Sequence, residues 1–286
     1  MEPDTRKTVL ITGAGVDGIG GSLAEEFHRK GYRVFATARR EGPLEPLKAQ
    51  GIEILSLDVT KAESILECKH KLEALTGGKL DVLVNNAGRN YTMPALDLDL
   101  NEIKDMFEIN VFGVMMVTKA FAPLLIEAKG KIVMIGSLAG VMPYAFGSAY
   151  GASKGALHSY TNTLRVEMKP FGVQVINIVT GGVASQLARV DRQLPSDSYY
   201  NPIKEFFAKR VAYSQRNSIP APTYAKSVVA HVIKSYPSPW AYHGYFAWRA
   251  WFLDTFFPNW IFDGFMSAQF GLSKLRKIWD DKRKQA

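Results

Sequence analysis

The chain has 286 residues, 47% of them hydrophobic, which suits one large globular domain with an ample core. Its net charge of +8 favours anionic ligands or membrane surfaces, but no nucleic-acid-binding motif accompanies it. The single cysteine, Cys68, excludes an intrachain disulfide and, with a polar N-terminus, predicts a cytoplasmic rather than secreted protein.

Apolar strand patterns alternate with helical patterns along most of the chain. Strands are predicted near 7–12, 32–37, 52–57, 80–84, 131–136 and 173–179, and helices near 20–30, 62–74, 101–128 and 148–169. This alternation indicates an α/β fold with a Rossmann-type, doubly wound parallel sheet. We predict one catalytic domain over residues 5–238, with no separate substrate domain, followed by an aromatic and basic C-terminal extension over 239–286.

A glycine-rich turn follows the first predicted strand and precedes a helical pattern, which is the setting of a dinucleotide-binding motif. Glycines allow the backbone to approach a pyrophosphate, and the helix N-terminus offers N–H groups and a positive potential. The residues predicted to bind cofactor here are Thr12, Gly13, Gly18, Ile19 and Gly20.

The second predicted strand ends at Ala38, where a site for NAD would usually present an acidic residue to the ribose 2′-hydroxyl. Arg39 and Arg40 follow instead, and arginine suits the 2′-phosphate of NADPH. NADPH is therefore the predicted cofactor; the alternative is that both arginines are solvated charges at a strand end.

Tyr150 and Lys154 stand four residues apart and share one face of a predicted helix. A nearby ammonium stabilises a phenolate by about 3 kcal/mol, so we expect Lys154 to lower the pKa of Tyr150. Ser137, thirteen residues earlier at a strand end, can hold the same substrate oxygen. A carbonyl reductase or an alcohol dehydrogenase needs side chains of these kinds for proton transfer to or from the substrate oxygen.

Taken together, these motifs resemble the short-chain dehydrogenase/reductase superfamily over about residues 5 to 190. The matching segments, in the family's order, are Thr12-Gly13…Gly18-Ile-Gly20, Asp58-Val59-Thr60, Asn85-Asn86-Ala87-Gly88, Asn110-Val111, Ser137, Tyr150…Lys154 and Thr180-Gly181-Gly182-Val183. More narrowly, Asn85–Tyr91, Phe121–Leu125 and the tail after Trp240 are similar to fungal NADPH-dependent 1-acyldihydroxyacetone phosphate reductase-like proteins.

The resemblance implies further roles. The expected catalytic residues are Asn110, Ser137, Tyr150 and Lys154, with Asn110 bending its helix and holding a water that links the lysine to solvent. The remaining cofactor-binding residues would be Asp58, Val59, Asn85, Ala87, Gly88, Gly181 and Val183, together with Tyr150 and Lys154, and the site would contain no metal. A homodimer or homotetramer is expected through the helices of 101–128 and 148–169.

Two positions depart from the family pattern. Four residues separate Gly13 from Gly18 where the family usually has three, so we expect an enlarged phosphate loop with Asp17 directed to solvent. Thr180 stands where the family commonly has proline, which could alter the nicotinamide loop without abolishing binding.

Residues 185–222 follow that loop, where the family places a substrate lid. Arginines and lysines in this segment, Arg189 and Arg192 among them, could meet a substrate phosphate or could simply be the solvated face of an amphipathic helix. The sequence therefore names no ligand for a substrate phosphate.

Thirteen aromatic residues lie between Trp240 and Phe270, and basic residues follow. This composition suits insertion into one leaflet of a membrane, on the endoplasmic reticulum or a lipid droplet. The alternatives are that the tail walls the substrate pocket or forms a dimer interface.

The sequence thus predicts NADPH-dependent reduction of a ketone on an apolar or lipid-like substrate, with 1-acyldihydroxyacetone phosphate as the candidate. A ketoreductase or dehydrogenase that tailors a fungal polyketide or terpenoid would carry the same motifs, because pocket residues decide the substrate. A non-catalytic NADPH-binding scaffold at a lipid surface is the third alternative, against which the complete set of catalytic residues argues.

Overall fold

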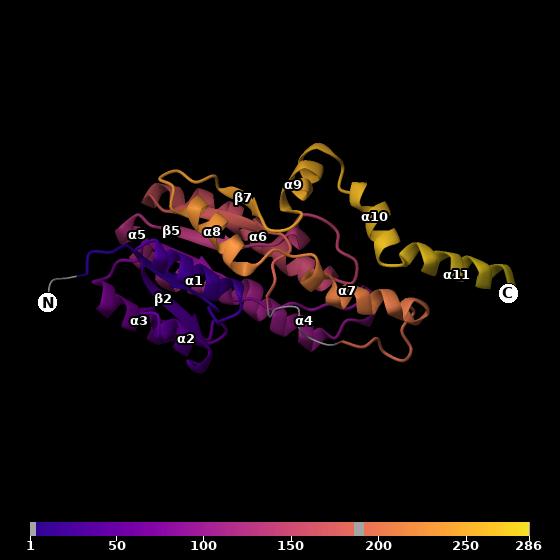
Figure 1. Cartoon of the computed structure of the whole chain (residues 1–286), viewed down its shortest axis with the longest axis horizontal. Coiled ribbons are helices and arrows are strands. Elements are labelled where there is room, and N and C mark those ends of the chain that lie inside the picture. The colour runs from indigo at the N-terminus through magenta and orange to yellow at the C-terminus, as the bar shows by residue number, and fades with distance from the viewer. Residues whose placement is uncertain (1–3, 186–191, 286) are drawn as a thin grey trace.

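The computed structural model describes residues 4–185 and 192–285 and is built on one parallel sheet of seven strands in the order β3-β2-β1-β4-β5-β6-β7 (Figure 1). Strand order reverses between β1 and β4, so the sheet is doubly wound, as predicted. The strands are β1 (Thr8–Ile11), β2 (Arg33–Ala38), β3 (Glu53–Ser56), β4 (Val82–Asn85), β5 (Lys131–Ile135), β6 (Gln174–Thr180) and β7 (Trp240–His243).

Helices cover both faces of the sheet (Figure 1). They are α1 (Ile19–Arg29), α2 (Glu45–Lys48), α3 (Ala62–Thr76), α4 (Leu100–Phe107), α5 (Gly113–Ala128), α6 (Ser148–Met168), α7 (Lys204–Arg216), α8 (Ala221–Val232), α9 (Ala247–Phe256), α10 (Ile261–Gln269) and α11 (Leu272–Gln285). The helices predicted at 20–30, 62–74 and 148–169 correspond to α1, α3 and α6.

Each face of the sheet has its own apolar core. Helix α1 buries Leu23, Ala24 and Phe27 beside α8 on one face, a spacing that places the three side chains on one helical stripe. Helices α3, α5 and α6 bury theirs on the other face, where Phe121 is fully enclosed. Because both faces are covered, the strands are mostly apolar, and the carboxyl-end edge is left open for a ligand.

The helix predicted over 101–128 is interrupted. A π-helical segment over Glu108–Phe112 separates α4 from α5 and contains Asn110. Next to it, a Cβ on Gly113 would lie 2.7 Å from the Val59 carbonyl oxygen, so glycine permits the close approach of the two segments. The whole stretch from Leu100 to Ala128 is apolar and long enough to cross a bilayer, but half of its most apolar window is buried in the protein.

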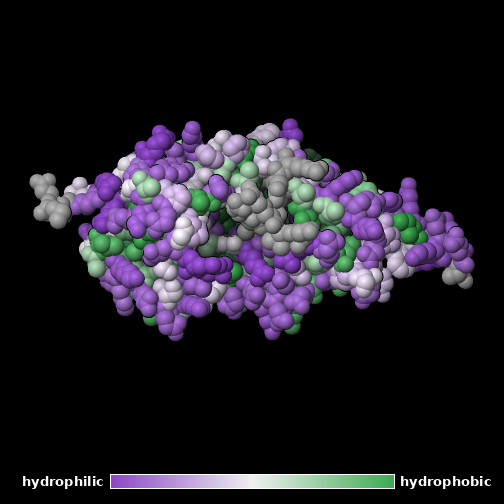
Figure 2. All heavy atoms as spheres, turned by 60° about the horizontal axis from the view of Figure 1, so that its bottom comes forward, coloured by the Kyte–Doolittle hydropathy of each residue, from purple (hydrophilic) through white to green (hydrophobic). Residues whose placement is uncertain are grey.

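The first strand of the C-terminal extension belongs to the sheet. Trp240–His243 forms β7 and pairs in parallel with β6, so the catalytic domain continues past the predicted boundary at residue 238. Beyond β7, helices α9, α10 and α11 lead away from the sheet toward the far end of an elongated molecule (Figure 1). On the face shown in Figure 2 the surface is mostly hydrophilic, including the projecting C-terminal end.

The predicted lid contains helix α7 and the start of α8, while its residues 186–191, Arg189 among them, lie outside the described part of the chain. A third apolar cluster joins α7 to the extension: Phe146, just before α6, packs against Phe207 of α7 and against Phe270 at the end of α10. Helix α7 and the C-terminal extension therefore form one layer over the carboxyl-end edge of the sheet.

We predict that Phe121→Ala lowers the free energy of unfolding by about 3–5 kcal/mol, because it leaves a cavity between α5 and the sheet. Met116→Ala on the same helix is the control: its side chain is 45% exposed, and we expect a change within about 0.5 kcal/mol. Urea denaturation of both variants measures the difference, and equal losses would contradict the assignment of Phe121 to the core.

Candidate active site

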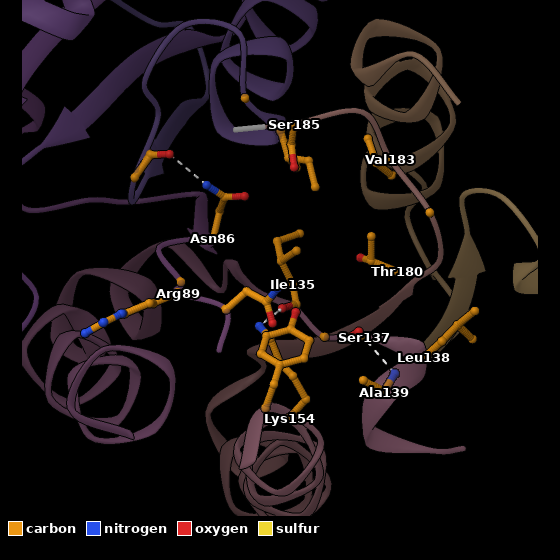
Figure 3. A pocket seen from close by; sticks show the side chains of 18 of the residues that line it. Asn86, Arg89, Ile135, Ser137, Leu138, Ala139, Lys154, Thr180, Val183 and Ser185 are labelled. Carbon is orange, nitrogen blue, oxygen red and sulfur yellow. Dashed lines mark hydrogen bonds between the residues drawn. The ribbon is translucent and has the colours of Figure 1, made fainter. Parts of the chain in front are cut away.

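A cavity of about 700 Å³ lies along the carboxyl ends of the strands. It extends from the glycine turn after β1, past Ser137 and Lys154, to the loop after β6 and the start of the C-terminal extension. Figure 3 shows Asn86 on one side of the open space, Thr180 and Val183 on the other, and Ser137 and Lys154 below it. Its size and position match those of cofactor sites in doubly wound sheets.

The predicted cofactor residues fall into two groups. Those that line the cavity are Gly13, Gly18, Ile19, Gly20, Arg39, Asp58, Val59, Ala87, Gly88, Tyr150, Lys154, Gly181 and Val183. Thr12, Arg40 and Asn85 are not among the lining residues and therefore contribute, if at all, indirectly.

At the glycine turn, Gly13 and Gly20 are required by sterics. Gly13 has a φ of +66°, and a Cβ there would lie 2.9 Å from Ala87 Cα. A Cβ on Gly20 would lie 2.5 Å from the Gly13 carbonyl oxygen. Because these glycines carry no side chains, a pyrophosphate can approach the backbone of the turn and the N-terminus of α1. Asp17 is exposed with a φ of +61°, in agreement with the expected direction to solvent.

The turn after β1 is tied to the turn after β4 by hydrogen bonds. The Thr12 hydroxyl accepts from the backbone N–H groups of Asn86 (3.0 Å) and Ala87 (2.9 Å). In return the Asn86 side-chain amide donates to the carbonyl oxygens of Thr12 and Gly13, both at 2.9 Å. Asn86 lines the cavity, whereas the predicted Asn85 is buried and donates to Thr118. Strand alternation could have distinguished the two positions.

Arg39 lies at the end of the cavity where the adenosine is expected, beside Asp58 and Thr60. The Thr60 hydroxyl and backbone N–H both donate to the Asp58 carboxylate, at 2.7 Å and 3.0 Å, and Arg39 is close enough to contribute to a lowered Asp58 pKa. One arginine, not two, therefore lines the cavity, and no carboxylate ends β2, so the residues present fit NADPH.

Ser137, Tyr150 and Lys154 meet at the middle of the cavity. Ser137 follows β5 and caps a short 3₁₀ turn, accepting from the Ala139 N–H at 3.1 Å. Tyr150 and Lys154 lie one turn apart on α6, and the Lys154 ammonium donates to the Ile135 carbonyl oxygen at 2.8 Å (Figure 3). The Lys154 nitrogen is 5.9 Å from the centre of the Tyr150 ring.

The pKa of Tyr150 differs from the sequence-based expectation. Burial raises it, and the opposing influences are the hydrogen bond with Ser137 and the charge of Arg210 rather than Lys154. Burial also lowers the pKa of Lys154 to about 8. The Lys154 ammonium is directed to the Ile135 carbonyl oxygen, and burial of the phenol is the largest influence on the Tyr150 pKa.

Asn110 is buried in the π-helical segment with all its side-chain groups satisfied by protein. Its carbonyl oxygen accepts from the Arg89 N–H (2.7 Å), and its amide donates to the Arg89 carbonyl (2.9 Å) and to the Ser153 hydroxyl (3.0 Å). Asn110 therefore holds the loop after β4 against α6, near Lys154. Its contacts are those of a positioning residue, and the predicted water relay stays a prediction.

His158 lies on α6, one turn after Lys154, and is a second positioning residue. The N–H of Ser137 donates to its Nε2 at 3.2 Å, and its ring packs edge-on against Trp240 of β7 at 5.3 Å. Burial lowers the His158 pKa to about 4, so the ring is neutral and able to accept at neutral pH. The four-residue spacing from Lys154 puts His158 on the catalytic face of α6, but its contact with Ser137 is seen only in the folded structure.

The loop after β6 is held by the extension. Gly181 donates to the His243 carbonyl (2.8 Å), and Gly182 and Tyr245 exchange backbone hydrogen bonds at 3.1 Å and 3.0 Å. A Cβ on Gly181 would lie 2.2 Å from the Tyr245 carbonyl oxygen, so this approach requires glycine. Thr180, which replaces the family's proline, shares a 2.7 Å hydrogen bond with the Tyr224 hydroxyl.

Beyond Tyr150 the cavity wall becomes largely apolar and aromatic. It is formed by the loop before α6, by α7 and by the C-terminal extension, through Met142, Tyr144, Arg210, Tyr213, Tyr245, Phe246, Arg249, Phe265 and Met266. The extension therefore walls the cavity, one of the three alternatives left open by the sequence.

A dinucleotide turn and a Ser–Tyr–Lys group in one cavity define an NAD(P)-dependent oxidoreductase. The family model described as short chain dehydrogenase matches residues 7–194, and the chain belongs to that family.

Relatives match over nearly the whole chain. Short-chain dehydrogenase fogD from Aspergillus ruber is 42% identical, with 98% of each chain covered. The NADPH-dependent 1-acyldihydroxyacetone phosphate reductase of Saccharomyces cerevisiae is 40% identical, covering 99% of this chain and 98% of the yeast protein. A solved short-chain dehydrogenase from Streptomyces avermitilis superposes with a TM-score of 0.76 at 28% identity, covering 97% of this chain and 98% of that one.

We predict that His158 makes stability depend on pH. Its folded-state pKa of about 4 lies below the ordinary value of 6.5, so the unfolded state binds more protons between these values. The contribution is complete above pH 6.5 and is lost as pH falls toward 4, at about 1.4 kcal/mol per pH unit.

His158→Gln should reduce this pH dependence of the free energy of unfolding, measured by urea denaturation between pH 4 and 7. His243, whose pKa burial also lowers to about 4, keeps part of the dependence. The control is His70→Gln, because His70 is exposed on α3. An unchanged slope in His158→Gln would show that the buried imidazole is not the source.

Proposed function

We propose that the chain reduces a ketone on an apolar or lipid-like substrate to a secondary alcohol with NADPH, and that 1-acyldihydroxyacetone phosphate is the candidate substrate. The observation that carries the proposal is the position of Ser137, Tyr150 and Lys154 between the glycine turn and an apolar, aromatic half of the cavity. The 40% identical yeast reductase named for this activity supports the substrate.

The residues divide the chemistry between them. NADPH, when bound, supplies the hydride to the carbonyl carbon. The hydroxyl groups of Ser137 and Tyr150 hold the carbonyl oxygen, and Tyr150 donates its proton to the developing alkoxide. Because burial raises the pKa of Tyr150, its phenol is protonated at neutral pH, which suits the direction of reduction. Lys154, with a pKa of about 8, is placed to return a proton.

A second candidate function is the tailoring of a fungal polyketide or terpenoid ketone. The 42% identical fogD protein, named only as a short-chain dehydrogenase, keeps this alternative open. The two functions share all catalytic residues and differ only in the substrate half of the cavity. A non-catalytic scaffold is disfavoured because the complete catalytic group meets in one cavity.

The test is oxidation of NADPH by the purified chain with 1-acyldihydroxyacetone phosphate and with a panel of unphosphorylated ketones. Tyr150→Phe should lower kcat by about a hundredfold to ten-thousandfold, because the proton donor is lost. Arg39→Ala should raise KM for NADPH by about tenfold to a hundredfold and leave that for NADH unchanged.

Turnover of the acyl phosphate, lost in Tyr150→Phe, would support the lipid substrate. Turnover confined to unphosphorylated ketones would assign the chain to the tailoring class. Equal rates with NADPH and NADH, unaffected by Arg39→Ala, would overturn the proposed cofactor preference.

We further propose that the extension attaches the chain peripherally to a lipid surface, such as the endoplasmic reticulum or a lipid droplet. On α9, α10 and their connection, large aromatic side chains are exposed: Trp248 (69%), Trp251 (37%), Phe252 (42%), Phe256 (63%), Phe257 (43%), Trp260 (68%) and Phe265 (50%). The following helix α11 is rich in basic residues, which favours anionic lipids. Phe265 also lines the cavity, so this patch adjoins the substrate half.

Flotation with vesicles of phosphatidylcholine and phosphatidylserine tests this attachment. Replacing Trp248, Phe256 and Trp260 together by serine should weaken binding on the order of a hundredfold, because three exposed aromatic side chains no longer enter the bilayer. Phe171→Ser, at a 50% exposed phenylalanine after α6, is the control and should bind as the parent chain does. Equal flotation of all three proteins would refute the role of the patch.

A further inference from the structure

One arginine in the substrate half of the cavity is enclosed, whereas the other is exposed. Arg210 of α7 and Arg249 of α9 both line this half. Arg210 is only 4% exposed, while Arg249 is an exposed residue. Arginine is almost never buried without a partner, so the surroundings of Arg210 indicate what its charge is for.

The contacts of Arg210 fix the side chain but do not neutralise it. Its Nε donates to the Ala145 carbonyl oxygen at 3.0 Å. Its guanidinium stacks over the ring of Tyr144 at 4.0 Å and lies 5.7 Å from the ring of Phe270. These contacts hold the plane of the group in one place, as a preorganised ligand requires, and none of them is with an anion.

No carboxylate forms an ion pair with Arg210 within residues 4–185 and 192–285. The neighbouring arginine in the lid segment, Arg192, is different, because it pairs with Glu102 at 3.1 Å. On the same helix as Arg210, Glu205 pairs with Lys274, at 2.9 Å, and so faces away from the cavity charge. The groups that interact electrostatically with Arg210 are the hydroxyls of Tyr144, Tyr150 and Tyr213.

Arg210 also lies near the reacting centre. Its charge opposes the effect of burial on the Tyr150 pKa, an influence that requires proximity to the phenol. Both residues line the same cavity, as does Tyr144, over whose ring the Arg210 guanidinium stacks. An anionic group on a short connection to the carbonyl carbon could therefore reach the guanidinium while the carbonyl oxygen reaches Ser137 and Tyr150.

We propose that Arg210 is the specificity-determining residue for an acidic group, phosphate or carboxylate, carried close to the ketone of the substrate. A planar guanidinium enclosed by aromatic rings binds such a group bidentately and with little competition from water. This inference rests on the proposed ketone reduction and defines its substrate class: an apolar chain for the aromatic wall, and an anion near the carbonyl for Arg210.

Arg210 could alternatively act only as a brace between α7, the loop at Ala145 and the extension. A brace would affect every substrate equally, since it maintains the shape of the wall. An anion ligand affects only substrates that carry the anion. Pairs of ketones that differ in charge alone therefore separate the two roles.

The experiment uses two matched pairs: acyldihydroxyacetone phosphate with its dephosphorylated form, and a long-chain β-keto acid with its methyl ester. Each is assayed for NADPH oxidation by the full chain and by Arg210→Gln, Arg210→Lys and Lys209→Gln. Lys209 is the control because it is an exposed cation on the same helix, beside Phe206. Thermal unfolding of each variant records its folding separately.

We expect the parent chain to prefer the charged member of at least one pair, and Arg210→Gln to lower kcat/KM for that member by on the order of a hundredfold through KM. The uncharged member should change less than about threefold, Arg210→Lys should recover part of the loss, and Lys209→Gln should change neither. The pair that shows the preference identifies phosphate or carboxylate.

Equal losses for charged and uncharged members, or no preference for charge in the parent chain, would overturn the proposal and leave Arg210 as a brace. Should no ketone of either pair be reduced while Tyr150→Phe and the parent behave alike, the proposed function itself fails. The two failures are thus distinct. Binding of the product-like lysophosphatidate against monoacylglycerol, followed by tryptophan fluorescence, provides a readout independent of turnover for Arg210→Gln.

Discussion

The contact between the turn after β1 and the turn after β4 is the constraint on which the rest of the site depends. Gly13 can lie against Ala87 only because it lacks a Cβ, and the reciprocal hydrogen bonds of Thr12 and Asn86 close the contact. This junction sits where strand order reverses, so it fixes the cofactor loop relative to β4 and β5. Ser137, which follows β5, thereby acquires a defined position relative to the hydride donor.

A second layer of support comes from buried side chains that hold the segments around the cavity in place. His158 accepts the Ser137 N–H, Asn110 joins the loop after β4 to Ser153 on α6, and Thr180 bonds Tyr224 beneath the nicotinamide loop. Each of these groups is buried and hydrogen-bonded, so rotation would leave a polar atom without a partner. These hydrogen bonds within the protein therefore hold the reacting groups in position.

Local sequence patterns predicted most of the sheet and the catalytic residues, but they did not predict contacts between residues that are far apart in the sequence. Apolar runs and turns identified six strands, whereas β7 was missed because Trp240–His243 lies in an aromatic segment and pairs only with the distant β6. The order of the motifs predicted most of the cavity-lining residues. Strand alternation, however, puts Asn86 rather than the predicted Asn85 at the cavity, and the predicted Arg40 does not line it. The enclosure of Arg210 depends on Tyr144 and Phe270, which are remote in sequence.

The residues that carry out the reaction and the residues that surround the substrate come from different parts of the chain. The family model ends at residue 194, and the groups that handle hydride and proton all precede that point. Most of the wall of the substrate half, from α7 through α10, comes after residue 194, and β7 joins this later part of the chain to the sheet. Substitutions after residue 194 can therefore change which ketone fits the cavity while Ser137, Tyr150 and Lys154 stay in place.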